Sequence, residues 1–362
     1  MFSSYKNILV TGGAGFVGSN LGIALKREFE NTTVTALDNL RRRGSELNLA
    51  RLRSYGIQFQ HGDIRNREDF QETAPFDLLI DCSAEASVHA GYQSEPAYVV
   101  NTNLGGTINC IETARRLDAD VVFLSTSRVY PIARLQALPL EVIGKRLAIP
   151  VSSSGSGWSA SGISTDFPLD GFRSLYGATK LASELLLLEY AEMYNLRVII
   201  NRCGVLSGPW QMGRVDQGFV SLWAASHKFG GRLTYKGFGG LGHQVRDVLH
   251  ITDLYDLLKK QLENFETARN NIYNVGGGPN VSTSLAELSD LCAPYTNHSL
   301  QIQAAPKTTK ADIPYYVTDN SMVSKTFDWE PKRDMNNILD DIFRWLADHQ
   351  DTLKPIFRNN DS

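Results

Sequence analysis

Residues 11–18, TGGAGFVG, follow a short apolar run and precede a segment with helical spacing. Gly12, Gly15 and Gly18 stand three residues apart in this stretch. Glycine allows a tight turn between a strand and a helix and lets the backbone approach a pyrophosphate, whose charge the N–H groups at the helix N-terminus stabilise. The same spacing also fits a tight turn that binds nothing, so the surrounding sequence has to decide.

Around this turn, short apolar runs alternate with helical patterns. We expect helices at 16–29 and 96–117 and a strong helix at 174–195. Such alternation indicates βαβ units, and right-handed crossovers between them give a doubly wound parallel sheet. The expected strands cover 7–12, 33–38, 56–64, 76–84, 119–126 and 196–209.

The later half of the chain has a less regular pattern, which predicts a smaller mixed α/β lobe. We expect residues 1–200 to form a nucleotide-binding domain and residues 201–362 mostly a substrate-binding lobe, with some segments returning to the first domain. Residues 150–167 are rich in Ser and Gly and predict a loop, which is either functional or a surface insertion. Residues 336–348 predict a last amphipathic helix.

The composition excludes several classes of protein. The 362 residues carry a net charge of −3, which gives no attraction to nucleic acid or to a membrane surface. The seven histidines are scattered and predict no metal site. The four cysteines are far apart and predict free thiols in a reducing compartment. Because MFSSYKNILVTGG runs directly into a strand without a signal pattern, we expect a cytoplasmic protein.

Two carboxylates follow later strands and bear on the nucleotide. Asp38 ends the second strand, where a carboxylate accepts hydrogen bonds from ribose hydroxyls and repels a 2′-phosphate, which favours NAD over NADP. Residues 41–43 are all arginine, which favours NADP unless they form a solvated loop. Asp63 ends the third strand and fits either the adenine edge or a helix N-cap.

A candidate proton-transfer site lies in the expected helix 174–195. YGATK places Tyr176 and Lys180 four residues apart, on one helix face. A phenol titrates near pH 10, and a neighbouring ammonium favours the phenolate and lowers its pKa, so the pair can take a proton from an alcohol. Residues 123–131, FLSTSRVYP, add hydroxyl groups at the end of the fifth strand.

Taken together, these motifs resemble the extended short-chain dehydrogenase/reductases, specifically the nucleotide-sugar epimerases and dehydratases. The resemblance rests on TGGAGFVG, DNL, GDI, NLGGT, STSRVY, YGATK and QVRDVLH, which occur in order over nearly the whole chain. It implies an NAD-binding Rossmann domain, a nucleotide-sugar substrate and a homo-oligomer, either a dimer or a tetramer. A narrower likeness to 2-epimerases of CDP-sugars rests on DNLRRRGSELNL, HGDIRN, DQGFVSLW and GHQVRDVLH.

The resemblance also implies residue roles. Tyr176 would be the base, Lys180 would hold the nicotinamide ribose, and Thr126 would orient the reacting oxygen. Arg246 would contact the diphosphate, with an ion pair to Asp247 or Asp253 as the alternative. The implied cofactor site comprises Gly12, Gly15, Phe16, Val17, Asp38, Asn39, Asp63, Ile64, Ser83, Ala84, Asn103, Tyr176 and Lys180. The implied substrate site comprises Ser125, Ser127, Arg128, Arg202, Gln211, Asp216, Gln217 and Arg246; for Ser125 and Ser127, strand-end capping is the alternative.

The chain departs from the family pattern near the expected sugar pocket. Pro131 follows Tyr130 where Gly is common, Glu85 stands where a small residue is usual, and Cys203 and Gly204 replace a common asparagine. A 4-epimerase would use the same Tyr, Lys and Thr, so this function remains an alternative. A 4,6-dehydratase would carry an Asp–Glu pair after Thr126, where this chain has Ser127 and Arg128. A ketoreductase would use NADPH, against Asp38, and an NAD-binding protein without activity would typically lack Tyr176 or Lys180.

Overall fold

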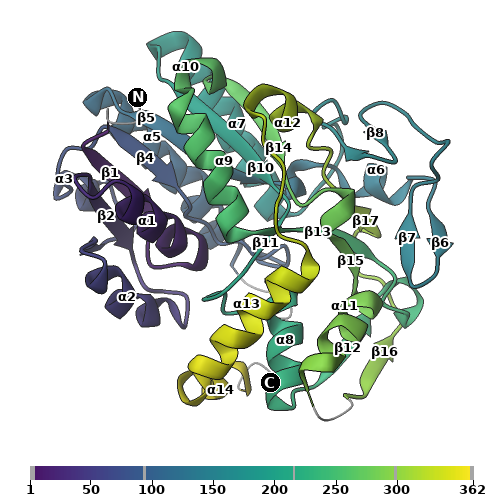
Figure 1. The fold of residues 1–362 in the computed structure, drawn as a ribbon. Helices are drawn as coiled ribbons and strands as arrows, with labels where there is room; N and C mark the ends of the chain where they lie inside the picture. The colour runs from purple at the N-terminus through teal and green to yellow at the C-terminus, as the bar shows by residue number, and fades with distance from the viewer. Residues whose placement is uncertain (1–4, 93–94, 215–216, 297–299, 359–362) are drawn as a thin grey trace. The chain divides into compact units, whose positions relative to one another are not determined.

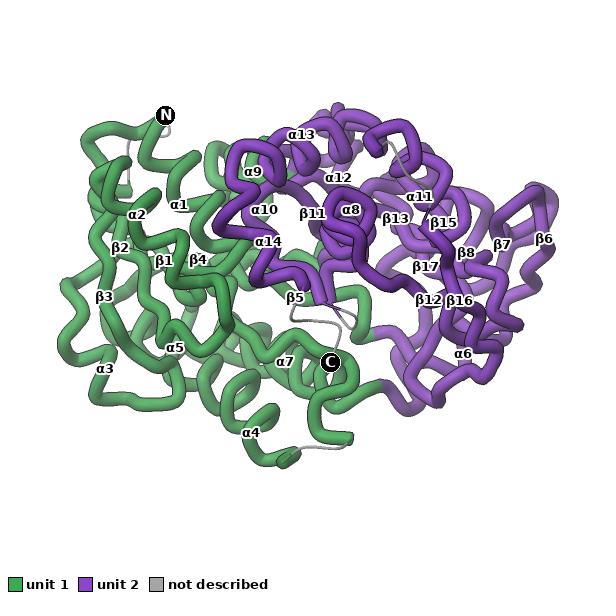
Figure 2. The backbone as a smooth tube through the Cα atoms, turned by 90° about the horizontal axis from the view of Figure 1, so that it is seen from below, with its two compact units in different colours: residues 1–129, 174–202, 254–273 green, residues 130–173, 203–253, 274–362 purple. Residues whose placement is uncertain are grey.

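The computed structural model describes residues 5–92, 95–214, 217–296 and 300–358. Its contacts divide the chain into two compact units, coloured separately in Figure 2. Unit 1 comprises residues 1–129, 174–202 and 254–273, and unit 2 comprises residues 130–173, 203–253 and 274–362. Each unit therefore gathers three separate segments. The division of NAD and sugar binding between the two parts of the chain stays a prediction.

Unit 1 is built on a seven-stranded sheet, with strand order β14-β10-β5-β4-β1-β2-β3. The β1–β2, β1–β4, β2–β3 and β4–β5 pairs are parallel. The order reverses between β1 and β4, as in a doubly wound fold, so the expected sheet is confirmed. The strands are β1 (Asn7–Thr11), β2 (Thr33–Asp38), β3 (Gln58–His61), β4 (Leu78–Asp81), β5 (Asp120–Thr126), β10 (Val198–Cys203) and β14 (Asn271–Val275).

Helices cover both faces of this sheet. They are α1 (Phe16–Glu28), α2 (Asn48–Ser54), α3 (Arg67–Gln71), α4 (Pro96–Val100), α5 (Gly106–Leu117), α7 (Leu175–Tyr194), α9 (Ile251–Glu263) and α10 (Phe265–Ala268). Figure 1 shows α1 and α9 in front of the sheet and α5 and α7 behind it. The buried core under α5 and α7 includes Leu9, Leu79, Val121, Phe123, Ile111, Leu187 and Val198. Alternation along β5 thus turns Phe123, and with it Ser125, toward α7.

Unit 2 is a mixed assembly of short strands and helices, and it is not smaller than unit 1, contrary to the smaller lobe expected from the sequence. Its largest sheet has the order β11-β13-β15, with β17 paired to β13, and three two-stranded pairs accompany it. The strands are β6 (Glu141–Ile143), β7 (Arg146–Ala148), β8 (Trp158–Ser159), β9 (Gly162–Ile163), β11 (Val205–Ser207), β12 (Leu233–Lys236), β13 (Val245–His250), β15 (Ser282–Ser284), β16 (Ile302–Ala305) and β17 (Tyr315–Tyr316). The helices are α6 (Ile132–Gln136), α8 (Phe219–Phe229), α11 (Leu285–Cys292), α12 (Ser321–Phe327), α13 (Met335–Asp348) and α14 (Gln350–Arg358).

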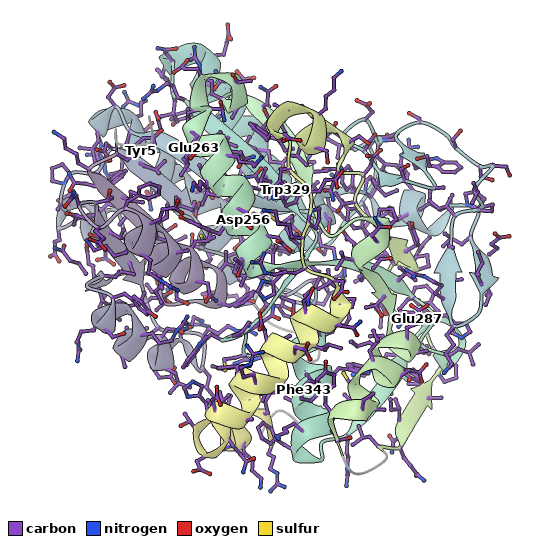
Figure 3. All side chains as sticks on the ribbon, viewed as in Figure 1. Tyr5, Asp256, Glu263, Glu287, Trp329 and Phe343 are labelled. Carbon is purple, nitrogen blue, oxygen red and sulfur yellow. The ribbon has the colours of Figure 1, made fainter. Side chains whose placement is uncertain are left out.

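Local chemistry explains where these helices begin. Ser284 and Glu287 close a capping box at the start of α11, and Glu287 is labelled in Figure 3. Asp334 and Asn337 close another at the start of α13. On α13, Phe343 stacks on Tyr295 with ring centroids 4.2 Å apart.

Three sequence expectations need correction. The single strand expected at 196–209 is two strands, β10 and β11, which belong to different sheets. The loop expected at 150–167 contains the short hairpin β8–β9. The helix expected to be the last is followed by α14, which begins at Gln350. None of the helices in the described ranges has the length and apolarity needed to cross a bilayer.

Candidate active site

The candidate site lies where the strand order of unit 1 reverses. In the register of β1 with its two neighbours, Thr11 is paired with both Leu37 and Asp81, so three strands end at the same level. Gly12 follows with φ +63°, and a Cβ on it would lie 3.0 Å from the backbone of Cys82 and Ser83. Ligands of doubly wound sheets bind at such a reversal, beyond the carboxyl ends of the strands.

The glycine turn fits a pyrophosphate. A Cβ on Gly13 would lie 2.6 Å from the Cα of Ala36, and a Cβ on Gly18 would lie 2.3 Å from the carbonyl oxygen of Gly12. The turn therefore needs glycine in order to close. It leads into α1 at Phe16, and this helix has no side-chain cap and no acidic residue in its first turn. The N-terminus of α1, with Gly15, Phe16 and Val17, thus keeps the partial positive charge that favours an anion.

Asp38 lies beside this turn. Its carboxylate accepts hydrogen bonds from the backbone N–H groups of Ala14, at 3.1 Å, and Leu40, at 2.8 Å. Burial raises the pKa of Asp38 above its ordinary value, although these N–H groups favour the charged form. A carboxylate has about four acceptor positions, so Asp38 can still accept from ribose hydroxyls.

Asp63 and Asn39 form a second polar cluster in unit 1. Asn39 donates a hydrogen bond to Asp63 at 2.9 Å, and Arg65 forms an ion pair with the same carboxylate at 2.6 Å. Burial alone would raise the pKa of Asp63, but the bonds from Arg65 and Asn39 outweigh it and lower the pKa to about 2. Ile64 is buried beside them, within 2.3 Å of where a Cβ on Gly106 would lie.

The segment after β4 is held from two sides. Ser83 donates from both its backbone and its hydroxyl to Asp81, while the Ser83 carbonyl accepts from Lys180 at 3.4 Å. Ala84 follows directly. Asn103, in the π-helical turn Asn101–Gly105, accepts from the Glu85 N–H at 2.8 Å and donates to Thr179 at 3.1 Å. Asn103 thus links this segment to the helix that carries the Tyr/Lys pair.

The hydroxyl groups at the end of β5 have different surroundings. The Thr126 hydroxyl accepts from the Arg128 N–H at 3.1 Å, which fixes the oxygen while its own proton can be donated. The Ser125 hydroxyl instead donates to the buried Glu184 carboxylate. Ser127 and Arg128 lie in the 3₁₀ turn that follows, Ser127–Val129.

Tyr176 and Lys180 lie one turn apart near the start of α7. Ser174 caps the helix by accepting from the Gly177 N–H at 3.2 Å. Lys180 is 2% exposed, donates to the Leu124 carbonyl at 3.0 Å and lies 4.2 Å above the Phe123 ring. The helix thus fixes an ammonium and a phenol on one face, close to the end of β5. This arrangement can hold a proton acceptor and a hydroxyl donor for an alcohol substrate.

Arg202, one of the predicted substrate contacts, has a partner inside unit 1. Its guanidinium donates to both oxygens of Glu184, with distances of 2.7–3.1 Å. Arg202 and Glu184 are 3% and 1% exposed. This placement makes Arg202 part of an internal ion pair, and we leave it out of the proposed substrate site.

The remaining predicted substrate residues belong to unit 2. Arg246, on β13, donates to the carbonyls of Val245 at 2.7 Å and Ile313 at 2.6 Å. Gln211 donates to the Leu206 carbonyl at 2.8 Å. Gln217 exchanges backbone hydrogen bonds with Arg214, and Asp216 lies outside the described residues. Two nitrogens of the Arg246 guanidinium thus donate to backbone carbonyls, and Asp253, one of its two predicted ion-pair partners, forms an ion pair with Arg333.

Sequence reasoning missed Glu184 and Asp81. Glu184 stands four residues after Lys180, so helical spacing places it on the same face and could have identified it. Asp81 ends β4 and accepts from the Thr11 hydroxyl at 2.7 Å beneath the glycine turn. Only its position at a strand end, shared with Asp38 and Asp63, could have pointed to it.

Comparison with known proteins gives a consistent result. The model of the NAD dependent epimerase/dehydratase family matches residues 8–276. CDP-paratose 2-epimerase from Salmonella typhi is 31% identical over 349 residues, which cover 94% of this chain and 99% of that protein.

Two solved structures share the fold over nearly the whole chain. UDP-glucose 4-epimerase from Thermus thermophilus, in complex with NAD, has a TM-score of 0.75 at 25% identity and covers 94% of this chain and 99% of its own. dTDP-glucose 4,6-dehydratase from Streptomyces venezuelae, with NAD bound, has a TM-score of 0.76 at 25% identity and covers 97% of this chain and 99% of its own. The chain is thus similar to proteins with three different named reactions.

Proposed function

Because the chain belongs to the NAD dependent epimerase/dehydratase family, we propose that it inverts C2 of a CDP-linked sugar of the CDP-paratose/CDP-tyvelose type. The family makes it an NAD-dependent enzyme of nucleotide sugars. The observation that carries the finer proposal is the 31% identity with a CDP-paratose 2-epimerase over 94% of the chain.

The proposed reaction assigns one task to each residue of the candidate site. Bound NAD supplies a hydride acceptor that returns what it takes, so no cofactor is consumed. Tyr176 removes the proton from the C2 hydroxyl and gives it back to the same oxygen after the keto sugar has turned over. Lys180, held by the Leu124 carbonyl, favours the phenolate form of Tyr176. Thr126 donates its hydroxyl proton to the reacting oxygen.

The sugar has to stay attached while it turns, so the nucleotide needs its own anchor. We propose Arg246 for the diphosphate, because a guanidinium can bind phosphate oxygens through two parallel hydrogen bonds. Its donation to the carbonyls of Val245 and Ile313 restrains the side chain before a ligand arrives. Ser127, Arg128, Gln211 and Gln217 remain proposed contacts of the sugar or base.

A 4-epimerase is the second candidate. The similarity to UDP-glucose 4-epimerase from Thermus thermophilus supports it, and Tyr176, Lys180 and Thr126 would serve it unchanged. The two proposals differ in the sugar carbon and in the nucleotide, and therefore in which substrate is converted.

The test is proton NMR of the purified protein with CDP-paratose and no added cofactor. We expect conversion to CDP-tyvelose, and at least a 100-fold loss of rate in Tyr176→Phe, at the scale of a lost acid–base group. Tyr190→Phe is the matched control, because Tyr190 is on the same helix but donates to Glu112 at 2.6 Å. Conversion of a UDP-sugar at C4 in place of CDP-paratose would favour the second candidate. If no sugar of a UDP, GDP, CDP and dTDP panel reacts, the epimerase proposal fails.

A further inference from the structure

Three residues on one face of α7 point to a function for Glu184. Tyr176, Lys180 and Glu184 are spaced by four residues and so share this face. Glu184 is almost completely buried, and both of its oxygens accept from Arg202 on β10. One of the same oxygens accepts from the Ser125 hydroxyl on β5. A single carboxylate therefore joins α7 to two neighbouring strands of the sheet.

Two contacts between β5 and α7 follow one another in the same order along the strand and along the helix. Lys180 donates to the Leu124 carbonyl at 3.0 Å, and Glu184, one helical turn later, binds the next strand residue, Ser125. Two successive strand residues are thus tied to two successive turns of the helix. The residue after Ser125 is Thr126, whose hydroxyl is in turn held by the Arg128 N–H. Because Thr126 is the next residue of the chain, a displacement of Ser125 from Glu184 also displaces Thr126.

A stabilising role alone does not account for this arrangement. A buried ion pair gives little net stability compared with apolar residues of the same size, because both charges lose their hydration. Nor does Ser125 offer its hydroxyl proton to a substrate, because it donates that proton to Glu184. What the Glu184 carboxylate does achieve is a fixed distance between the end of β5 and the face of α7.

We propose that Glu184, oriented by Arg202, is a positioning residue that holds Ser125 and thereby fixes the end of β5, and with it Thr126, relative to α7, the helix that carries Tyr176 and Lys180. This inference rests on the proposed epimerase function for its kinetic consequence. Its structural consequence, the fixed position of Thr126, is independent of which sugar reacts. The roles of Ser125 and Arg202 then follow from their contacts with Glu184.

The test uses two variants and one matched control in the full chain. Ser125→Ala removes the link to β5 and leaves the Glu184–Arg202 pair in place. Glu184→Gln weakens both the interaction with Arg202 and the hydrogen bond from Ser125. Ser183→Ala is the control, because Ser183 is equally buried on α7 but donates to the backbone carbonyls of Thr179 and Asn103.

In both test variants, kcat should fall about 100-fold, the scale expected for a misplacement of about 1 Å, while KM and bound NAD stay within about twofold. The double variant should lose no more than Glu184→Gln alone, because both changes break the same contact. Additive losses, or a rise in KM with unchanged kcat, would overturn the proposal and make Ser125 a substrate contact. A lower melting temperature with unchanged kcat would reduce Glu184 to a purely structural role.

A measurement without substrate separates this inference from the proposed function. The Arg128 amide donates to the Thr126 hydroxyl, so its hydrogen exchange reports whether Thr126 is held in place. We expect about tenfold faster exchange of this amide in Ser125→Ala and Glu184→Gln but not in Ser183→Ala, with amides of β1 unchanged. Wild-type exchange in both test variants would overturn the inference, even if the enzyme converts no CDP-sugar.

Discussion

Asp247 places a carboxyl group in the interior of unit 2. The residue is fully buried, and the Gly278 N–H donates to its Oδ2 at 3.3 Å. A Cβ on Gly276 would lie 1.9 Å from the same oxygen, and a Cβ on Gly204 would lie 2.8 Å from the other. A larger residue at either position would therefore have to displace the Asp247 carboxylate. Burial raises the pKa of Asp247 to about 6.

This raised pKa predicts a specific pH dependence of stability. As the pH falls, the folded chain takes up a proton near pH 6 and the unfolded chain only near about 3.9, so the group favours folding increasingly across that interval. Above pH 6 the buried carboxylate counts against folding. Asp247→Asn cannot take up this proton. Its melting temperature relative to wild type should therefore be highest above pH 6 and should decrease toward pH 5.

The measurement is a series of thermal melts of both proteins between pH about 5 and about 8. Asp348→Asn, at the exposed end of α13, is the matched control and should track the wild type throughout. A difference between Asp247→Asn and wild type that does not change with pH would contradict the prediction.

For single residues, the sequence predicted which functional side chains occur at the site. It predicted their hydrogen-bond and ion-pair partners less well. A hydroxyl cluster at residues 125–127 followed from the strand end, but whether Ser125 or Thr126 faces α7 depends on the strand register. Arg202 was predicted to bind substrate, because a sequence does not show that Glu184 lies within 2.7 Å of it. Pairing across elements is set by the fold, and single-residue arguments do not contain it.

Among the elements, α1 combines two buried glycines with opposite constraints. A Cβ on Gly18 would press into the glycine turn, 2.3 Å from the Gly12 carbonyl oxygen. A Cβ on Gly22, one turn later, would meet Ile57 and Val34 at 3.7 Å, an ordinary contact distance. The first glycine is required by the shape of the nucleotide turn, and the second is not.

We therefore expect opposite results for the same substitution at these two positions. Gly18→Ala should lose more than about 90% of the NAD that copurifies with the protein, because the turn has to open. Gly22→Ala should keep its NAD and raise the free energy of unfolding by about 0.5–1 kcal/mol, since alanine is favoured inside a helix. NAD released by acid and urea unfolding measure the two effects. A full NAD content in Gly18→Ala would contradict the steric argument.

Elements with strong periodicity were the ones the sequence predicted well. The helix expected at 174–195 is α7, Leu175–Tyr194, and the strand expected at 119–126 is β5, Asp120–Thr126. The hairpin β6–β7 was not expected, because the side chains of β6 are exposed and those of β7 are half-buried, with no hydrophobic alternation toward a core. The π-helical turn at Asn101–Gly105 also left no signal, because its residues continue a helical pattern.

At the scale of the whole molecule, unit 1 is completed only when the chain returns to it after residue 253. Residues 254–273 supply most of α9, whose Leu254, Leu257 and Leu258 are buried, and Tyr255 donates to Glu28 of α1 at 2.7 Å. The sequence indicated that later segments return to the first domain but not which ones. Hydrophobic periodicity gives the type of each element and does not give the sheet that it joins.

This return predicts the behaviour of truncated chains. A chain that ends at residue 202 lacks α9 and β14, so apolar surface on one face of the sheet stays uncovered. It should show no cooperative thermal transition and no bound NAD. A chain that ends at residue 275 contains every segment of unit 1 and should show both. Circular dichroism melts and NAD content compare the two, and equal behaviour would contradict the prediction.

The division into three segments per unit has a consequence for synthesis on the ribosome. Unit 1 begins with the first residues, yet its last segment ends at residue 273 of 362. By then, two of the three segments of unit 2 have also been translated. Neither unit can finish folding before about three quarters of the chain has emerged. The face of the nascent sheet that α9 covers therefore stays exposed until residues 254–273 have emerged. Exposed apolar surfaces of this kind are what chaperones bind.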